Sequence, residues 1–143
     1  MQFICDAADA QSWFRIETEG EAATESLDMH HAVEKFFLLE QKKAAQQYHP
    51  PSGSYFERDI ALNAHLRNTM PLFATLRDRE GNGLVTAMLP PGGRETPNFR
   101  IIIVGPRNGD PYPKHKPAIA VLGAHFGLSL ERDRCFPYRQ AGN

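Results

Sequence analysis

The spacing of apolar residues changes several times along the chain, and each change predicts a different element. Near the N-terminus, residues 2–5 ("QFIC") and 12–18 ("SWFRIET") are rich in strand-favouring residues, and the turn-forming stretch "DAADAQ" separates them. In the second segment Phe14 and Ile16 share one face while Trp13 and Arg15 share the other, which is the period of a half-buried strand. These segments predict two strands that could form a hairpin.

Residues 21–48 have a helical pattern instead. They contain no glycine or proline and consist mostly of strong helix formers. Their apolar residues approximate one stripe at helical spacing: Leu27, Val33, Phe36, Phe37, Ala44 and Tyr48. We expect one long helix or two helices joined near His30, ending at "HPPSGS" (49–54) because Pro50 disfavours helical geometry at His49.

A second, shorter helix is expected over residues 55–68. Asp59 is a candidate N-cap, and Ile60, Leu62 and Leu66 supply a modest apolar face.

After Pro71 the pattern returns to a period of two. The segments "LFATLRD" and "GLVTAMLP" flank "REGNG", which predicts a hairpin because Asn and Gly tolerate the positive φ of tight turns. Residues 98–105 ("NFRIIIVG") are apolar on both faces, which is typical of a strand that is central in its sheet. A last helix is expected from about Pro117 to Phe126, with Gly127 just beyond its end.

This order predicts an α+β fold of one domain over residues 1–143. It comprises a mostly antiparallel five-stranded sheet, built from two N-terminal strands and a three-strand meander after the helices, with a C-terminal helix and an irregular tail from about residue 131. The order of two strands, a helical segment and three strands resembles that of PAS-type sensor domains. The resemblance covers element order only, and it implies a sensor of small ligands as one alternative.

Composition and charge narrow the choice of partners. The chain has 143 residues, of which 41% are hydrophobic and 23% charged, and its formal net charge is −1. Such a charge gives no overall attraction to nucleic acid, and no nucleic-acid-binding motif organises the arginines, so this partner is not expected. Residues 1–60 carry a balance of −6 and residues 61–143 one of +5. Either the two halves attract each other within the fold, or the second half presents an electropositive face.

The two cysteines and the apolar runs indicate the compartment. Cys5 and Cys135 are far apart and form no C-x-x-C pattern, which argues against a disulfide scaffold. The N-terminus does not resemble a secretory leader, and no apolar run approaches the roughly 20 residues of a membrane span. We expect a cytoplasmic protein without membrane partners.

Candidates for catalysis are weak. Glu25, Asp28, His31 and Glu34 recur every three residues and could share a helix face, but a carboxylate–histidine metal site would need partner ligands, and His65 is the sole candidate on the next helix. Cys135 lies among Arg132, Arg134 and Arg139, which could lower its pKa if the thiol is exposed. No nucleophile elbow or phosphate-binding glycine motif is present, so we predict no catalytic residue, metal ligand or cofactor.

The loop of residues 105–116 is the strongest candidate binding segment. It leaves the apolar strand and enters a helix N-terminus, where backbone N–H groups favour anions. It could be a plain connection, an anion site built on its cations, or a protein contact in which Tyr112 stands on a stiff, proline-rich extended segment. The candidate binding residues are Arg107, Asn108, Tyr112, Lys114, His115 and Lys116.

The absence of a catalytic set favours a small, soluble, non-catalytic binding or accessory module that acts through protein contacts, self-association included. Two alternatives remain at this point. One is a sensor-like domain that binds a small ligand or anion through residues 105–116. The other is a small enzyme with a reactive Cys135 or a His-carboxylate metal site.

Overall fold

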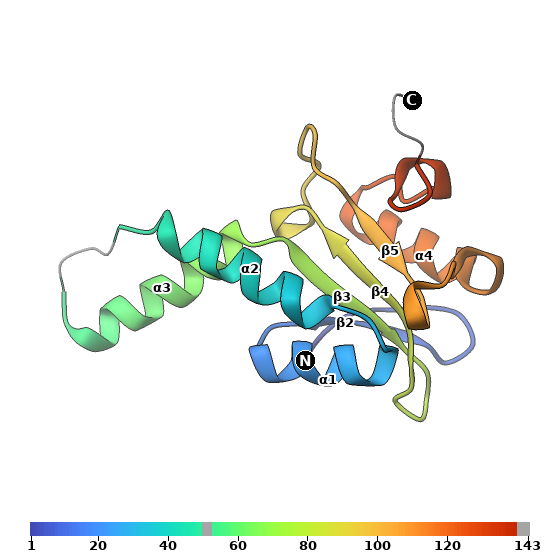
Figure 1. Cartoon of the computed structure of the whole chain (residues 1–143), viewed down its shortest axis with the longest axis horizontal. Coiled ribbons are helices and arrows are strands. Elements are labelled where there is room, and N and C mark those ends of the chain that lie inside the picture. Colours follow the sequence, from blue (N-terminus) through green and yellow to red (C-terminus); the bar gives the residue numbers. More distant parts are fainter. Residues whose placement is uncertain (50–52, 140–143) are drawn as a thin grey trace.

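The computed structural model describes residues 1–49 and 53–139, and within them a five-stranded sheet carries helices on both faces (Figure 1). The strands are β1 (Gln2–Asp6), β2 (Ser12–Ile16), β3 (Leu72–Arg77), β4 (Gly83–Leu89) and β5 (Ile102–Val104). They lie in the order β1-β2-β3-β4-β5, and each neighbouring pair is antiparallel. With the C-terminal helix α4 (Tyr112–Phe126), this confirms the predicted α+β fold and both hairpins.

The helical region divides near His30, as one of the two alternatives proposed. Helix α1 (Glu19–Met29) begins at a capping box between Thr18 and Glu21 and ends where His30 adopts the left-handed conformation with φ 53°. Helix α2 (Val33–Gln46) follows. Because the break shifts the helical phase, the expected single stripe is wrong: Phe37 is buried, whereas Leu27 is 74% exposed.

Helix α3 (Tyr55–Thr69) begins at the residue predicted from the sequence, but its N-cap differs from the prediction. The N-cap is Ser54, not Asp59, because the Ser54 hydroxyl accepts from the Glu57 N–H (3.2 Å) while the Glu57 carboxylate accepts from the Ser54 N–H (3.1 Å). The helix breaker expected at Pro50 lies outside the described residues.

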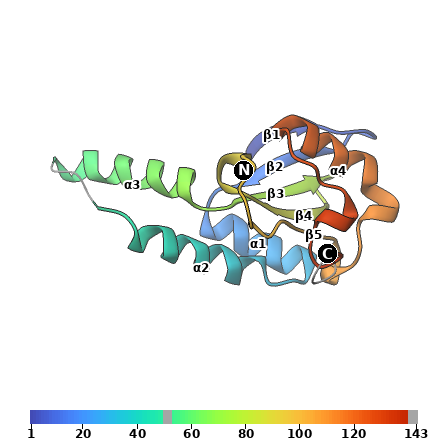
Figure 2. The same cartoon turned by 90° about the horizontal axis from the view of Figure 1, so that it is seen from above.

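Side chains along the strands point alternately to the two faces of the sheet, and each face has its own apolar core. On one face Trp13, Leu76 and Val85 pack beneath Ile119 and Leu122 of α4. The other face meets α1 and α2 through a smaller cluster made of Ile16, Ala22, Val33, Phe37, Ala44, Met70 and Phe73. The sheet is therefore the middle layer of three, with α4 on one side and α1 and α2 on the other (Figure 2).

The apolar strand over residues 98–105 is not central, which corrects the prediction. β5 forms the edge of the sheet, and the central strand is β3, where every residue is buried. Apolar residues on both faces show that layers cover the strand from above and below, but they do not show how many strands lie beside it. The tail partly covers the outer side of β5, since the Ile103 N–H donates to the Phe136 carbonyl (3.1 Å) and the Phe136 N–H donates to the Ile101 carbonyl (2.8 Å).

The loop before α4 is shorter than expected because the helix begins at Tyr112 and not near Pro117. Pro117 lies inside the helix, and the backbone departs from helical geometry at His115 (φ −121°, ψ 17°). Proline lacks the N–H that would bond to residue 113 and crowds that carbonyl, which accounts for the irregular turn. The expected irregular tail includes a 3-10 turn at Arg132–Arg134, and its residues 140–143 lie outside the described part.

Candidate functional site

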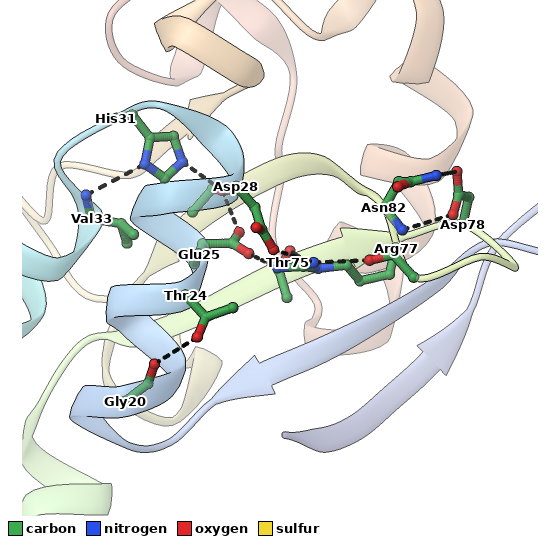
Figure 3. Close-up of polar contacts among 12 residues, drawn as sticks. Gly20, Thr24, Glu25, Asp28, His31, Val33, Thr75, Arg77, Asp78 and Asn82 are labelled. Carbon is green, nitrogen blue, oxygen red and sulfur yellow. Dashed lines mark hydrogen bonds and ion pairs between the residues drawn. The ribbon is translucent and has the colours of Figure 1, made fainter.

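A buried ion pair joins α1 to the central strand (Figure 3). Arg77, the last residue of β3, donates from its terminal nitrogen to Oε1 of Glu25, whose side chain is 0% exposed. Strand alternation places Arg77 on the face that meets α1. Gly83 on β4 lets α1 approach closely, because a Cβ at this position would lie 2.6 Å from the Met29 sulfur.

The other two nitrogens of Arg77 also have partners. Its Nε donates to the Thr75 hydroxyl (3.1 Å), and the second terminal nitrogen donates to the Gly81 carbonyl (2.9 Å) and contacts the Asp28 carboxylate (3.4 Å). A buried charge is tolerated when it is paired and its hydrogen bonds are complete. Arg77 therefore ties α1, β3 and the β3–β4 turn into one polar cluster.

A second chain of hydrogen bonds leads from Glu25 to His31. The Thr86 hydroxyl donates to Oε2 of Glu25 (2.5 Å), and Nε2 of His31 lies 2.8 Å from the same hydroxyl. The Val33 N–H donates to Nδ1 of His31 (3.4 Å), so a neutral ring carries its proton on Nε2 and donates to Thr86. Burial lowers the pKa of His31, although the charge of Glu25 opposes this effect, and the ring is therefore neutral at pH 7.

The direction of this chain decides what chemistry it can support. A nucleophilic threonine needs a neighbouring base that accepts its proton. Here Thr86 donates to a carboxylate already paired with Arg77, and His31 donates to Thr86. The arrangement therefore fixes side chains in place and does not activate a nucleophile.

A small pocket of about 110 Å³ opens beside this chain. Its polar side chains belong to His31, Thr86 and Asn108, the last of which is a sequence candidate. The remaining lining residues are largely apolar: Ala32, Val33, Phe36, Phe73, Met88, Ile102 and Val104.

The other candidate binding residues do not gather around Asn108. Lys114 and His115 line a separate hollow of about 270 Å³, while Tyr112 and Lys116 line a third of about 740 Å³. Arg107 is exposed and lines none of these three hollows. The structure thus distributes the six candidates over several surfaces.

Tyr112 and Asp110 have contacts within the fold that differ from the predicted binding roles of this segment. Tyr112 is helical and buried, and its hydroxyl donates to the Leu130 carbonyl (2.8 Å), so the expected aromatic on an extended segment is wrong. The Asp110 carboxylate accepts from the Tyr112 N–H (3.0 Å) and from Nε of Arg132 (2.9 Å). The N-terminus of α4 therefore already has a carboxylate.

The candidate catalytic residues do not have the surroundings that catalysis would require. Cys135 is buried, and burial raises the pKa of its thiol, which corrects the idea that nearby arginines lower it. His31 lies beyond the end of α1, so it does not continue the helix face of Glu25 and Asp28, and both carboxylates face Arg77. Residues 1–49 and 53–139 contain no group of three or more His, Cys, Asp or Glu side chains that could hold a metal ion.

The largest departure from the main body is an arm formed by α2 and α3, which run side by side away from the sheet (Figures 1 and 2). His65 holds the two helices together through a 2.8 Å contact with the Ala44 carbonyl and a ring contact with Tyr48. None of the fifteen residues of α3 is buried, and Tyr55 and Phe56 are 89% and 73% exposed. Of the predicted apolar face of this helix, Leu66 packs against the smaller core, whereas Ile60 is 55% exposed.

A hollow of about 430 Å³ lies at the base of the arm, between α3, α2 and the end of β2. Arg67 spans its edge and pairs with Glu17 (2.5 Å). This pair and the Glu25–Arg77 pair join the acidic first half of the chain to the basic second half, as the first reading of the charge asymmetry expects.

The polar cluster and the exposed arm were both missed from the sequence. A signal for the cluster was present: Glu25 occupies an apolar position of the helix between Ala22 and Met29, while Thr75 and Thr86 occupy inward positions of strands. The exposure of α3 had only a weak signal, which was the modest apolar face formed by Ile60, Leu62 and Leu66.

A comparison with protein-family models, curated proteins and solved structures finds no match to the chain. None of the helices in the described ranges is long and apolar enough to cross a membrane.

The two partners of the buried pair should contribute to stability in a non-additive way. Glu25→Leu and Arg77→Leu are each expected to lower the free energy of unfolding by about 3 kcal/mol or more, because Glu25 would lose its cation and Arg77 would keep only the partly exposed Asp28 as a charged partner. The double variant should lose clearly less than the sum of the two. Urea denaturation measures these values. Asp28→Asn is the control, expected to cost under about 1 kcal/mol because Asp28 is partly exposed. Additive losses would contradict the pairing.

The environment of His31 predicts a pH dependence of stability. Because the pKa of His31 is lower in the folded state, the unfolded chain binds more protons below about pH 6.5. Stability should therefore fall as the pH is lowered from 7 through 6.5 and level off below the folded pKa. Denaturation of the native protein and of His31→Gln across this range isolates the contribution of His31, and equal slopes for the two would contradict the assignment.

Proposed function

We propose that this chain is a non-catalytic protein-binding module and that its contact surface is the α2–α3 arm. The observation that carries the proposal is that α3 exposes all of its faces to some degree, with no buried residue along its length. A helix of this length is marginal in water without tertiary packing. A surface that covers Phe56 and Ile60 would supply the packing that the body of the protein does not.

The chemistry of the arm suits a protein partner. Large apolar side chains at its surface include Phe36, Leu39, Tyr55, Phe56 and Ile60. Aromatic anchors of this kind dominate protein interfaces, where they are desolvated between polar rims. Residues 33–69 carry five cationic and four anionic side chains, which supply a rim of mixed sign.

Site-specific photocrosslinking in the cells of origin tests this function. A benzophenone amino acid at position 56 or 60 should crosslink to a defined protein, identified by mass spectrometry. The same amino acid at Leu27 should not, although Leu27 is 74% exposed and Phe56 73%, because Leu27 lies on α1 outside the arm. No protein crosslink at positions 56 and 60, or equal crosslinking at position 27, would contradict the proposal.

The pocket beside His31 favours a second candidate function, the binding of a small ligand. Its lining is mostly apolar, with a few polar groups that could orient a ligand, which is the usual character of small-molecule sites. A volume of about 110 Å³ suits a small apolar molecule that bears one hydrogen-bonding group.

A thermal-shift screen with small aromatic and aliphatic alcohols and amides tests this second function. A ligand should raise the melting temperature by mass action, and Val104→Phe should abolish the rise by filling the pocket. Ala120→Val, at an exposed position of α4, is the control and should leave the rise unchanged. A flat response of the native protein would count against ligand binding at this pocket.

A further inference from the structure

Helix α3 carries an apolar projection and an apolar hollow on the same face. Phe56, Asp59 and Ile60 precede Asn63, Leu66 and Arg67 by seven residues each. Seven residues are close to two helical turns, so the two sets share one face and lie about 10 Å apart along the axis. The second set lines the hollow at the base of the arm, whereas the first set is exposed beyond it.

The two sets are complementary in shape and polarity. Phe56 and Ile60, which are 73% and 55% exposed, form the projection. The hollow is lined by apolar side chains from three other segments, namely Ile16, Phe37, Met70 and Pro71. When an apolar side chain enters the hollow, both this side chain and the apolar lining are removed from water. The burial of apolar surface is the main source of stability in such contacts.

They are also complementary in charge. Arg15 and Arg67 both line the hollow, and Arg15 donates to the backbone carbonyl of Arg67 (2.9 Å). Burial and the neighbouring charge of Arg67 lower the pKa of Arg15, while Glu17 is the one carboxylate in the lining. The hollow thus has an excess of positive charge. Asp59 lies on the projecting set and forms no ion pair with the described residues.

We propose that the partner of the arm is a second copy of this chain, packed antiparallel along α3. Phe56 and Ile60 of each copy enter the hollow of the other, and Asp59 faces Arg15 and Arg67 of the other copy. A two-fold axis that crosses α3 midway between the two sets brings both contacts into place at once, as a self-complementary dimer interface requires. This inference rests on the proposed function, for which it names the partner.

The charge of the arm favours a second copy over a polyanion. Nucleic acids and anionic membranes select dense cationic surfaces. The arm instead mixes both signs, with Asp59 placed among the residues of its projecting face.

Sedimentation equilibrium tests the dimer from micromolar to near-millimolar concentration. The native protein should sediment as a monomer–dimer equilibrium. Ile60→Asp should weaken association about tenfold or more, because it places a charge in the apolar contact, and Asp59→Arg should do the same by facing two arginines. Leu27→Asp is the matched control on α1 and should not change the dissociation constant. Circular dichroism checks that each variant keeps its helices.

Crosslinking between differently labelled copies tests the antiparallel arrangement. Equal amounts of chains with light and heavy nitrogen isotopes are mixed, with a benzophenone amino acid at position 56. Crosslinked peptides should contain one chain of each isotope and should join position 56 to the segment 63–67 of the other copy. Crosslinks between position 56 and position 56 of the other copy would indicate a parallel pairing and would overturn the inference.

The outcomes separate this inference from the proposed function. A native protein that stays monomeric, yet crosslinks through position 56 to a different protein in cells, overturns the dimer and leaves the arm as a binding surface. A monomer without any cellular crosslink overturns both. A dimer that Ile60→Asp and Asp59→Arg leave unchanged lies on another surface and overturns the inference as well.

Discussion

The structure depends on how a charged arginine is buried at the end of its central strand. β2 and β3 are neighbours in the sheet, although all of α1, α2 and α3 lie between them in the sequence. The inserted helices must therefore fold back onto the face of the sheet. The pair of Glu25 and Arg77 joins α1 to β3 at that point, and Thr86 extends the contact to β4. An unpaired charge here would be costly, so the position of α1 is defined by polar complementarity as well as by apolar packing.

The position of α1 determines how much of this face of the sheet α2 and α3 can cover. α1 and the first part of α2 cover the face of the sheet opposite α4, with Ala22, Val33 and Phe37 in its smaller core. The rest of α2 extends past the sheet, and α3 returns along it. Only the end of α3 nearest the sheet touches the smaller core, where Leu66 packs against it, and none of its residues is buried. The exposed apolar side chains of the arm follow from this geometry.

Much of the fold was accessible from local patterns. The two hairpins were predicted from strand periodicity and turn residues, and a break near His30 was one of the two alternatives for the helical region. These features depend on neighbours within a few residues. The predictions for β5 and α4 were less accurate. The number of strands beside β5 depends on the whole sheet. The prolines suggested that α4 begins near Pro117, whereas it begins at Tyr112, whose hydroxyl bonds to the distant Leu130 carbonyl. The candidate site was predicted poorly for a related reason: the six residues of the loop are close in sequence but point to different surfaces.

The sequence by itself determined the fold class, the order of elements and the ends of several helices, because hydrogen bonding, capping and side-chain periodicity act over short distances. Only the tertiary structure decided which polar residues meet and which apolar residues remain exposed. Glu25 and Arg77 are 52 positions apart, and their pairing depends on the return of the chain from α3 to β3. Phe56 is likewise exposed because the arm extends beyond the edge of the sheet. The position of that edge cannot be predicted from the sequence of α3 alone.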